Sequence, residues 1–338
     1  MSNSKHVFII AEAGVNHNGD VNIAKELVEA AAKAGADAVK FQTFKAENLV
    51  TKNAPKANYQ EKTTGKGSQF EMLKNLELSY QDHLLLKKYC EEKGILFIST
   101  PFDFESVDIL EELNIPIYKI GSGDLTNIPL LRYIAKLRKP MIISTGMANL
   151  GEIETAIEAV NNVGNSQISL LHCTSNYPAS YESVNLKAMI TLKNAFNLPI
   201  GYSDHTEGIE IPLAAVAMGA EIIEKHFTLD KNMEGPDHKA SLNPVELKQM
   251  VQSIRNIERA IGNGIKKPYN SEENTKIAAR KSIVAKVNIK KGEVISYKNV
   301  DFKRPGTGIS PEYIDFIIGK KALCDIDQDG FISFSNIK

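Results

Sequence analysis

Short apolar runs that end in polar residues recur eight times along the first two thirds of the chain. They read VFIIAEAG at 7–14, AVKFQTF at 38–44, LFISTPF at 96–102, IYKIGSGD at 117–124, MIISTGM at 141–147, ISLLHCTSNY at 168–177, IGYSDH at 200–205 and IIEKHFT at 222–228. Aliphatic and β-branched runs of this length predict buried strands, and stretches with helical spacing separate most of them. Alternating strands and helices form parallel sheets, and eight such units close into a barrel. We therefore predict an α/β fold whose first domain is a (β/α)8 TIM barrel.

The segments between the runs show the apolar periodicity of amphipathic helices. Helices are predicted at 21–35, 79–93, 104–113, 127–137, 149–163, 185–196, 207–219 and 243–262. Asp20 and Gly35 supply the start and stop signals of the first helix. Residues 45–70 differ, because this long polar segment is rich in Lys, Asn, Thr and Gly and predicts a functional lid or a mobile loop.

The pattern changes after Gly262-Asn263-Gly264. Residues 263–280 are polar and basic, which predicts a linker. Beyond it, SIVAKVNIKKGEVI and KKALCDIDQDGFIS are strand-like runs broken by the turn-forming sequences KKGE and DQDG. The predicted organisation is a barrel over residues 1–262 and a small β-rich domain over 281–338 with little core of its own.

The composition is that of an ordinary globular protein and narrows the choice of partners. The chain has 338 residues, of which 43% are apolar and 24% charged, and its formal net charge is −1. This charge gives no electrostatic reason to expect nucleic acid or a membrane surface as a partner. The three cysteines are too few and too scattered for a zinc site or a disulfide framework. No signal peptide precedes the first run, and no apolar run approaches the length of about 18 residues that a membrane-spanning helix needs. We therefore expect a soluble, cytoplasmic protein.

Two histidines stand at the ends of neighbouring runs. Active sites of these barrels lie at the carboxyl ends of the strands, and His205 ends the seventh run while His226 ends the eighth. Two convergent imidazoles are a partial ligand set for Mn²⁺, Zn²⁺ or Co²⁺, with positions left for water and substrate oxygens. The alternative is that each imidazole only forms a hydrogen bond inside the barrel. His83 is predicted at the surface.

Lysines and serines near the strand ends are candidates for binding an anion. An unpaired ammonium inside an apolar strand is costly, so Lys40 and Lys119 are expected to hold anionic ligands. Lys225 alternates with His226, so it is predicted to face the helices and to pair with a carboxylate. Hydroxyl donors suited to a phosphate recur at the ends of three runs. They are Ser122, Ser144 and Ser203, and the alternative for each is a local turn or cap.

Carboxylates complete the set of polar strand ends. Glu12 ends the first run and is the strongest candidate for orienting a sugar hydroxyl or moving a proton. The alternative for these carboxylates is that they pair with the buried lysines. Asp204 directly precedes His205 and is predicted to orient a histidine. Asp124 follows the fourth run, and Asp237 lies in the GPD loop after the eighth.

Many short motifs, in order along nearly the whole chain, resemble the sialic acid synthases. They are GVNHNG at 14–19, KFQTF at 40–44, STPF at 99–102, KIGSG at 119–123, STGM at 144–147, SDH at 203–205, EKHFT at 224–228 and GPDH at 235–238. These enzymes condense phosphoenolpyruvate with a sugar of the N-acetylmannosamine type to a nonulosonic acid and release phosphate. The C-terminal segment, with IKKGEVI and KRPGTGIS, resembles the antifreeze-like (SAF) domain of the same enzymes.

The resemblance implies a role for each candidate residue. His205 and His226 would hold a divalent metal, usually Mn²⁺ or Mg²⁺, with Co²⁺ possible from the ligand type. Contacts to phosphoenolpyruvate would come from Lys40, Thr100, Lys119, Ser122, Ser144 and Ser203. Contacts to the sugar would come from Glu12, Gln42, Tyr177 and Asp237. Arg304 of a partner subunit would reach the sugar's N-acetyl group, which implies a domain-swapped homodimer.

Two positions depart from the family's pattern. Many members have Glu after the GSG turn where this chain has Asp124, to which a catalytic proton-transfer role is carried over beside Glu12 and Lys40. The HCTSNYP stretch varies within the family, and Ser175 in it is retained as a substrate-binding candidate.

Three alternatives stay open at this point. The sugar could be N-acetylmannosamine or, as in legionaminate synthesis, 2,4-diacetamido-2,4,6-trideoxymannose. The same fold supports Schiff-base aldolases, in which Lys40 or Lys119 would attack a carbonyl. A non-enzymatic protein could instead use the antifreeze-like domain as its binding surface.

Overall fold

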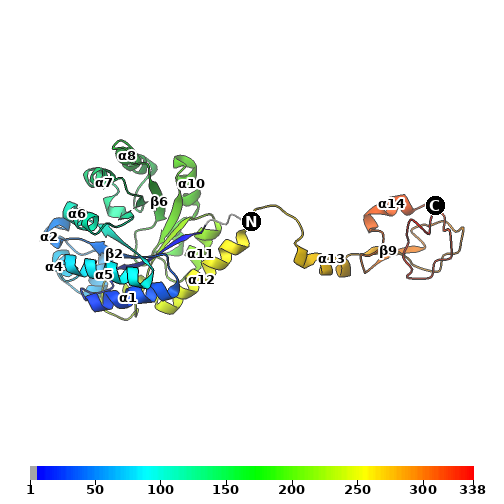
Figure 1. The fold of residues 1–338 in the computed structure, drawn as a ribbon, viewed down its shortest axis with the longest axis horizontal. Helices are drawn as coiled ribbons and strands as arrows, with labels where there is room; N and C mark the ends of the chain where they lie inside the picture. Colours follow the sequence, from blue (N-terminus) through cyan, green and yellow to red (C-terminus); the bar gives the residue numbers. More distant parts are fainter. Residues whose placement is uncertain (1–5) are drawn as a thin grey trace. The chain divides into compact units, whose positions relative to one another are not determined.

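Eight parallel strands form a closed barrel in the computed structural model, which describes residues 6–338 (Figure 1). The strands are β1 (Phe8–Gly14), β2 (Ala38–Thr43), β3 (Leu96–Pro101), β4 (Tyr118–Ile120), β5 (Met141–Ser144), β6 (Ile168–Cys173), β7 (Ile200–Asp204) and β8 (Ile222–His226). They are hydrogen-bonded in chain order, and β8 pairs with β1 to close the ring. Every strand lies within one of the predicted runs, so the predicted (β/α)8 barrel is confirmed.

Eight long helices cover the outside of the barrel (Figure 1). They are α1 (Val21–Ala34), α5 (Tyr80–Lys93), α6 (Phe104–Glu112), α7 (Ile128–Ala135), α8 (Leu150–Asn161), α10 (Lys187–Phe196), α11 (Glu210–Ala217) and α12 (Pro244–Ile261). Their ends follow local chemistry: the Asp20 side chain accepts a hydrogen bond from Asn22 N at the start of α1, and Gly35 ends it with φ of 83°. Each lies within a predicted helical range.

Residues 45–70 are not an irregular loop. They contain α2 (Ala46–Leu49) and α3 (Asn58–Thr64), and α4 (Gln69–Lys74) begins at the end of the segment. Lys56 Nζ donates to Thr64 Oγ1 and to the Gly65 carbonyl, both at 3.0 Å, and thereby fixes the end of α3. The buried side chain of Met72 on α4 packs in an apolar cluster with Val15. Sequence periodicity missed these helices, and also α9 (Tyr181–Val184), because each is too short to show a repeating apolar face.

The inside of the barrel is built in layers. An apolar layer below the strand ends consists of Ile10, Ala38, Ile98, Ile142, Leu171 and Ile222. Side chains two residues further along a strand point to the same face. This alternation places Glu12 above Ile10 and Lys40 above Ala38, and the two polar residues are register partners in neighbouring strands. The fold therefore turns the polar strand ends toward one another.

The outer face of β8 carries the lysine that was predicted to point toward the helices. Lys225 is fully buried, and its ammonium lies 2.5 Å from Asp204 Oδ2 and also donates to the Thr206 carbonyl. The predicted pairing with a carboxylate is confirmed. Asp204 consequently does not orient a histidine as expected, since its carboxylate is bonded to Lys225 and Thr206. His83 is also buried, against the prediction, with Nε2 2.8 Å from Thr43 Oγ1.

Residues 264–338 form a second compact unit. Its strands β9 (Ser282–Ala285) and β10 (Val300–Lys303) pair antiparallel. Its helical segments are η3 (Asn270–Glu272), α13 (Glu273–Ala279), η4 (Pro311–Tyr313) and α14 (Ile314–Ile317). The unit has an isoleucine-rich core of its own that includes Ile283, Ile289 and Ile332, each fully buried. Among residues 6–338, no helix has the length and apolar character needed to cross a membrane.

Removal of the Lys225 ammonium should destabilise the barrel strongly. Lys225→Met leaves the buried Asp204 carboxylate without its counter-ion, so the free energy of unfolding should fall by about 3–5 kcal/mol. The double variant Asp204→Asn/Lys225→Met removes both charges and should recover most of that loss. Urea unfolding of both proteins measures the difference, and equal losses would show that the ion pair does not set the stability of this region.

Candidate active site

A cavity of about 500 Å³ opens at the carboxyl ends of the barrel strands. Most of the residues predicted from the sequence line it together. These are Glu12, Lys40, Gln42, Thr100, Lys119, Ser122, Ser144, Ser175, Tyr177, Ser203, His205 and His226. The polar strand ends thus converge on one space, as expected for an enzyme built on this fold.

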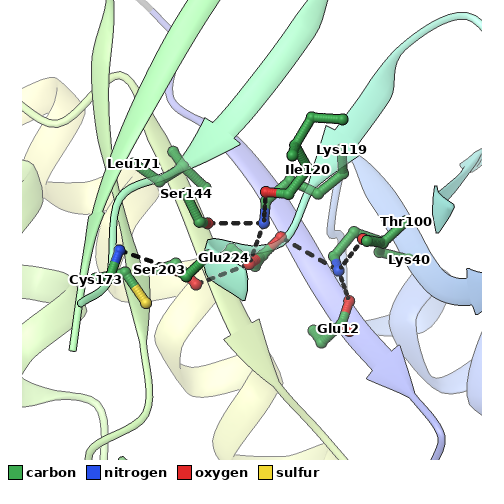
Figure 2. Close-up of polar contacts among 12 residues, drawn as sticks. Glu12, Lys40, Thr100, Lys119, Ile120, Ser144, Leu171, Cys173, Ser203 and Glu224 are labelled. Carbon is green, nitrogen blue, oxygen red and sulfur yellow. Dashed lines mark hydrogen bonds and ion pairs between the residues drawn. The ribbon is translucent and has the colours of Figure 1, made fainter. Parts of the chain in front are cut away.

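Four buried charges of alternating sign cross the floor of the cavity (Figure 2). Lys40 Nζ lies 2.7 Å from Glu12 Oε2 and 3.6 Å from Glu224 Oε2. On its other side, Glu224 Oε1 lies 3.2 Å from Lys119 Nζ. The four side chains are at most 6% exposed. We call Glu12, Lys40, Glu224 and Lys119 the charge ladder; its charges sum to zero, which offsets much of the cost of burying them.

The ladder shifts the pKa of each of its members. Burial raises the pKa of Glu12, and the nearby Lys40 opposes this only in part. Burial would also raise the pKa of Glu224, but Lys119 and Lys40 together hold it well below its usual value. Burial lowers the pKa of Lys119, and Glu224 compensates incompletely. The charged form of Lys119 is therefore the one that an incoming anion would stabilise most.

Hydroxyl groups are arranged around the ladder. Lys40 Nζ donates to Thr100 Oγ1 at 2.9 Å, and Lys119 Nζ donates to Ser144 Oγ at 2.7 Å. Ser203 Oγ donates to Glu224 Oε1 at 2.7 Å (Figure 2). Ammonium groups flanked by hydroxyls that can rotate toward a ligand are suited to phosphate and carboxylate oxygens.

Ser122 extends this set from the turn after β4. Its Oγ accepts a hydrogen bond from Gly146 N at 3.0 Å. A Cβ atom at position 146 would lie 2.8 Å from Ser122 Oγ and 2.3 Å from Ser175 Oγ, so a larger residue there would displace both hydroxyls from their present positions.

The two histidines are neighbours in the lining of the same cavity, with ring centroids 5.3 Å apart, and His226 is the register partner of Glu12. His205 Nδ1 lies 2.8 Å from the Thr174 carbonyl oxygen and must donate to it, which leaves Nε2 as an acceptor when the imidazole is neutral. Burial lowers the pKa of His205, but Cys173 and the Thr174 carbonyl outweigh it and raise the pKa above its usual value, so a metal would have to displace a proton there. His226 Nδ1 is buried without a hydrogen-bond partner among the described residues. Burial and the neighbouring His205 lower the pKa of His226 well below its usual value, which favours the neutral, metal-binding form.

The two imidazoles therefore have nitrogen atoms that could bind a metal ion. Within residues 6–338, no group of three or more His, Cys, Asp or Glu side chains is spaced to hold a metal. A metal on the pair alone would keep several positions for substrate oxygens and water.

Aromatic rings cover the histidines. The Tyr177 ring lies 4.1 Å from the His205 ring and 5.8 Å from the His226 ring, measured between centroids. Tyr59 of α3 stacks on Tyr177 at 5.1 Å with an interplanar angle of 27°. The segment that separates β2 from β3 thus contributes to the wall of the cavity.

Three of the predicted site residues do not line the cavity. Asp237 is buried beside it, with Oδ2 4.0 Å from His226 Nδ1, and burial raises the pKa of Asp237 to about 6. Asp124 lies in η1 (Ser122–Asp124), where its carboxylate accepts a hydrogen bond from the Asn127 side chain at 3.1 Å. Arg304 lies in the second unit, is exposed, and donates through Nε to the Ala279 carbonyl.

Several cavity residues were missed by sequence reasoning. Glu224 had a usable signal, because it stands two positions before His226 on the same strand and so shares its face. Cys173 had a similar signal at the end of β6, and it lies 3.7 Å from His205 Nδ1. Tyr59 had none, since a single aromatic residue in a polar segment does not reveal which way that segment folds.

Comparison with known proteins gives consistent results over the whole chain. The model of the NeuB family matches residues 27–266, and the model of the SAF domain matches residues 280–338. Two proteins named N,N'-diacetyllegionaminic acid synthase are similar to the chain. The one from Campylobacter jejuni is 55% identical over 97% of this chain and 99% of its own length. The one from Legionella pneumophila is 52% identical over 98% and 94%.

A solved structure agrees with these matches. The crystal structure of N-acetylneuraminic acid (sialic acid) synthetase from Leptospira borgpetersenii, in complex with citrate, superimposes with a TM-score of 0.71 at 41% identity. The superposition covers 80% of this chain and 90% of that one.

The ladder predicts a specific response to loss of its central carboxylate. Glu224→Gln leaves two buried ammonium groups with one carboxylate, so the free energy of unfolding should fall by about 3 kcal/mol. Added inorganic phosphate should stabilise this variant more than the wild type, because an anion can replace the missing negative charge.

Urea titrations with and without phosphate measure both effects. The matched control is Glu47→Gln, which breaks an exposed 2.8 Å ion pair with Lys74 and should change neither quantity. A variant as stable as the wild type would show that the lysines do not need Glu224 as a counter-ion.

Proposed function

This chain belongs to the NeuB family, and on that premise we propose that it joins phosphoenolpyruvate to an N-acetylated amino sugar, forming a nonulosonic acid and releasing phosphate. The observation that carries the proposal is one cavity whose lining brings together two buried ammonium groups, a set of hydroxyls and a pair of histidines. One side of the cavity suits an anion, and the other suits a polarised carbonyl oxygen. The names of the relatives also favour an enzyme over a protein that only binds through its small domain.

Phosphoenolpyruvate would bind at the ladder. Lys40 and Lys119 would hold its phosphate and carboxylate together with the hydroxyls of Thr100, Ser122, Ser144 and Ser203. Hydrogen bonds to charged groups contribute about 1.5–3 kcal/mol each, so several of them can hold the substrate without a dedicated phosphate loop. Binding would also favour the charged form of Lys119, whose pKa burial lowers.

A divalent metal, Mn²⁺ or Mg²⁺ with Co²⁺ as a further candidate, would be held by His205 and His226. When bound, it supplies Lewis acidity that polarises the aldehyde oxygen of the open-chain sugar, an effect worth several kcal/mol. Tyr177 packs against both imidazoles and restricts the access of water to them.

The sugar would lie between the histidines and Glu12, with contacts from Gln42, Tyr177 and Asp237. C3 of phosphoenolpyruvate forms a bond to the aldehyde carbon, and the aldehyde oxygen takes up a proton. Glu12 can carry that proton, because burial raises its pKa. Water then adds at C2, and the tetrahedral intermediate expels phosphate by cleavage of the C–O bond. Holding both substrates in one cavity removes much of the entropic barrier.

The acceptor that we propose is 2,4-diacetamido-2,4,6-trideoxymannose rather than N-acetylmannosamine. The reason is that two relatives above 50% identity, those from Campylobacter jejuni and Legionella pneumophila, are named N,N'-diacetyllegionaminic acid synthase. The product would then be a legionaminic acid with two N-acetyl groups.

The assembly and location of the chain are also proposals. The SAF domain match covers Arg304, whose guanidinium is exposed and donates through Nε to the Ala279 carbonyl; its terminal amino groups are the donors that could reach a ligand on another subunit. We propose a domain-swapped homodimer in the cytoplasm, in which Arg304 of one subunit contacts the N-acetyl group of the sugar bound to the other.

Turnover assays with both sugars test the reaction. With phosphoenolpyruvate and the diacetamido sugar, one phosphate should be released per nonulosonic acid formed, and ¹⁸O placed in the C2–O bond should leave with the phosphate. N-acetylmannosamine should give a kcat/KM lower by roughly tenfold or more. Product mass spectrometry and phosphate release are the measurements. A covalent adduct trapped on Lys40 or Lys119 by borohydride and pyruvate would instead favour a Schiff-base aldolase.

The metal site makes a separate prediction. His205→Ala should abolish turnover and lower the amount of Mn²⁺ bound in equilibrium dialysis, while the urea unfolding curve stays close to that of the wild type. Chelation of the wild type should have the same effect on turnover, and added Mn²⁺ should reverse it. The control is His6→Ala, an exposed histidine at the opposite end of β1 from Glu12. Full activity of His205→Ala in the presence of chelator would exclude the proposed site.

A further inference from the structure

A second cavity of about 600 Å³ adjoins the catalytic one. The two cavities share Ala57, Tyr59, Ser175 and Tyr177 in their linings. No member of the charge ladder lines the second cavity, which we call the outer cavity. It therefore continues the catalytic cavity past Tyr177, the residue that packs on both histidines, and not past the lysines that suit an anion.

The stacked tyrosines form the boundary between the two spaces. Tyr177 packs on His205, and Tyr59 packs on the far side of Tyr177 at a centroid distance of 5.1 Å. Tyr59 is half-buried and comes from α3, whereas Tyr177 follows β6. A ligand that approaches the histidines and extends into the outer cavity must therefore pass the ring of Tyr59.

Polar contacts hold Tyr59 in this position. The neighbouring Gln60 is buried, and its Oε1 accepts hydrogen bonds from Ala57 N at 2.9 Å and from Gln69 Nε2 at 3.4 Å. The Gln60 carbonyl accepts from Thr64 Oγ1 at 2.7 Å. Tyr59 is thus presented by a short helix that is fixed at both ends, so its ring can act as a defined wall.

The outer cavity adds room to the catalytic one. About 500 Å³ lies within the usual range for one small ligand, but here two substrates must share the space. With phosphoenolpyruvate on the lysines and the aldehyde end of the sugar at the histidines, the far end of the sugar can extend past the tyrosine pair into the outer cavity.

The walls of the outer cavity indicate which chemical groups it accepts. Much of its surface is apolar and is formed by Ala57, Pro178, Pro236, Ala240 and the two tyrosine rings. Such walls favour methyl groups, including the methyl of an acetamido group, and Thr63, Ser175 and Asn176 in the same lining offer hydrogen-bond partners for its amide. Two exposed lysines, Lys62 and Lys239, also line it and present a second possibility, a phosphate on the sugar's last carbon. The apolar walls and the absence of a buried cation in the lining of the outer cavity favour methyl and acetamido groups over a phosphate.

We propose that Tyr59 is a specificity-determining residue, whose ring forms with Tyr177 the entrance to an outer subsite that receives the C4 acetamido and C6 methyl end of the acceptor. The inference rests on the proposed function, since it assumes a sugar held with its aldehyde at the histidine pair. It assigns the choice of acceptor to α3 and the chemistry to the strands.

Substitution at Tyr59 tests the assignment through the ratio of two substrates. Tyr59→Ala should lower kcat/KM for the diacetamido sugar by about tenfold, as expected for loss of an apolar contact of this size, and for N-acetylmannosamine by no more than about twofold. Tyr59→Phe keeps the ring and should retain the wild-type ratio. The KM for phosphoenolpyruvate should stay unchanged in both variants, which also reports that the barrel mouth is folded.

The matched control is Tyr181→Ala, an exposed tyrosine on α9 that lines neither cavity and should leave both sugars unaffected. Equal losses for the two sugars in Tyr59→Ala would overturn the specificity role even if the wild type proves to be the proposed synthase. A wild type that prefers the 6-phosphate of N-acetylmannosamine, with that preference lost in Lys62→Ala/Lys239→Ala, would overturn the apolar subsite. Absence of turnover with any sugar would instead count against the proposed function itself.

Discussion

The mouth of this barrel is organised by the cost of burying charge. Glu12, Lys40, Glu224 and Lys119 are almost inaccessible to water, and each charge lies next to one of opposite sign. No single member of the charge ladder could be buried alone, because an unpaired ion would change its protonation state or destabilise the fold. The strand register that places Glu12 opposite both Lys40 and His226 is therefore as much an electrostatic requirement as a geometric one.

The same arrangement determines how an anionic substrate can bind. A ladder without net charge holds its lysines in place before the substrate arrives, so little side-chain ordering remains for the moment of binding. The substrate's phosphate and carboxylate must nevertheless compete with Glu12 and Glu224 for the ammonium groups. The low pKa of Glu224 means that it stays ionised and keeps attracting Lys119, whereas the raised pKa of Glu12 lets it take up a proton as new negative charge develops nearby.

The sequence was sufficient for the barrel and for most of the strand ends, since both follow from local patterns. Alternation along β8 correctly placed His226 inward and Lys225 outward. The same alternation places Glu224 on the inward face with His226, because the two residues are two positions apart. Segment 45–70 could not be read in this way. Its helices are short and polar, and they are held by tertiary contacts such as those of Gln60 and Met72 rather than by periodicity. The positions of Asp237 and Tyr59 depend on how such loops fold back, which no local pattern contains.

The cavity is formed by two kinds of element: barrel strands with a fixed register, and a short helix and loops that tolerate change. The groups suited to phosphoenolpyruvate and to a metal stand on strands whose register is fixed by the closed barrel, and a shift there would disturb the whole ring. The walls suited to the far end of the sugar come from α3 and from the loops after β6 and β8. Loops tolerate substitution better than strands that are hydrogen-bonded on both sides. A change of acceptor sugar thus needs to alter only residues such as Tyr59, while the charge ladder and its balance of buried charge remain as they are.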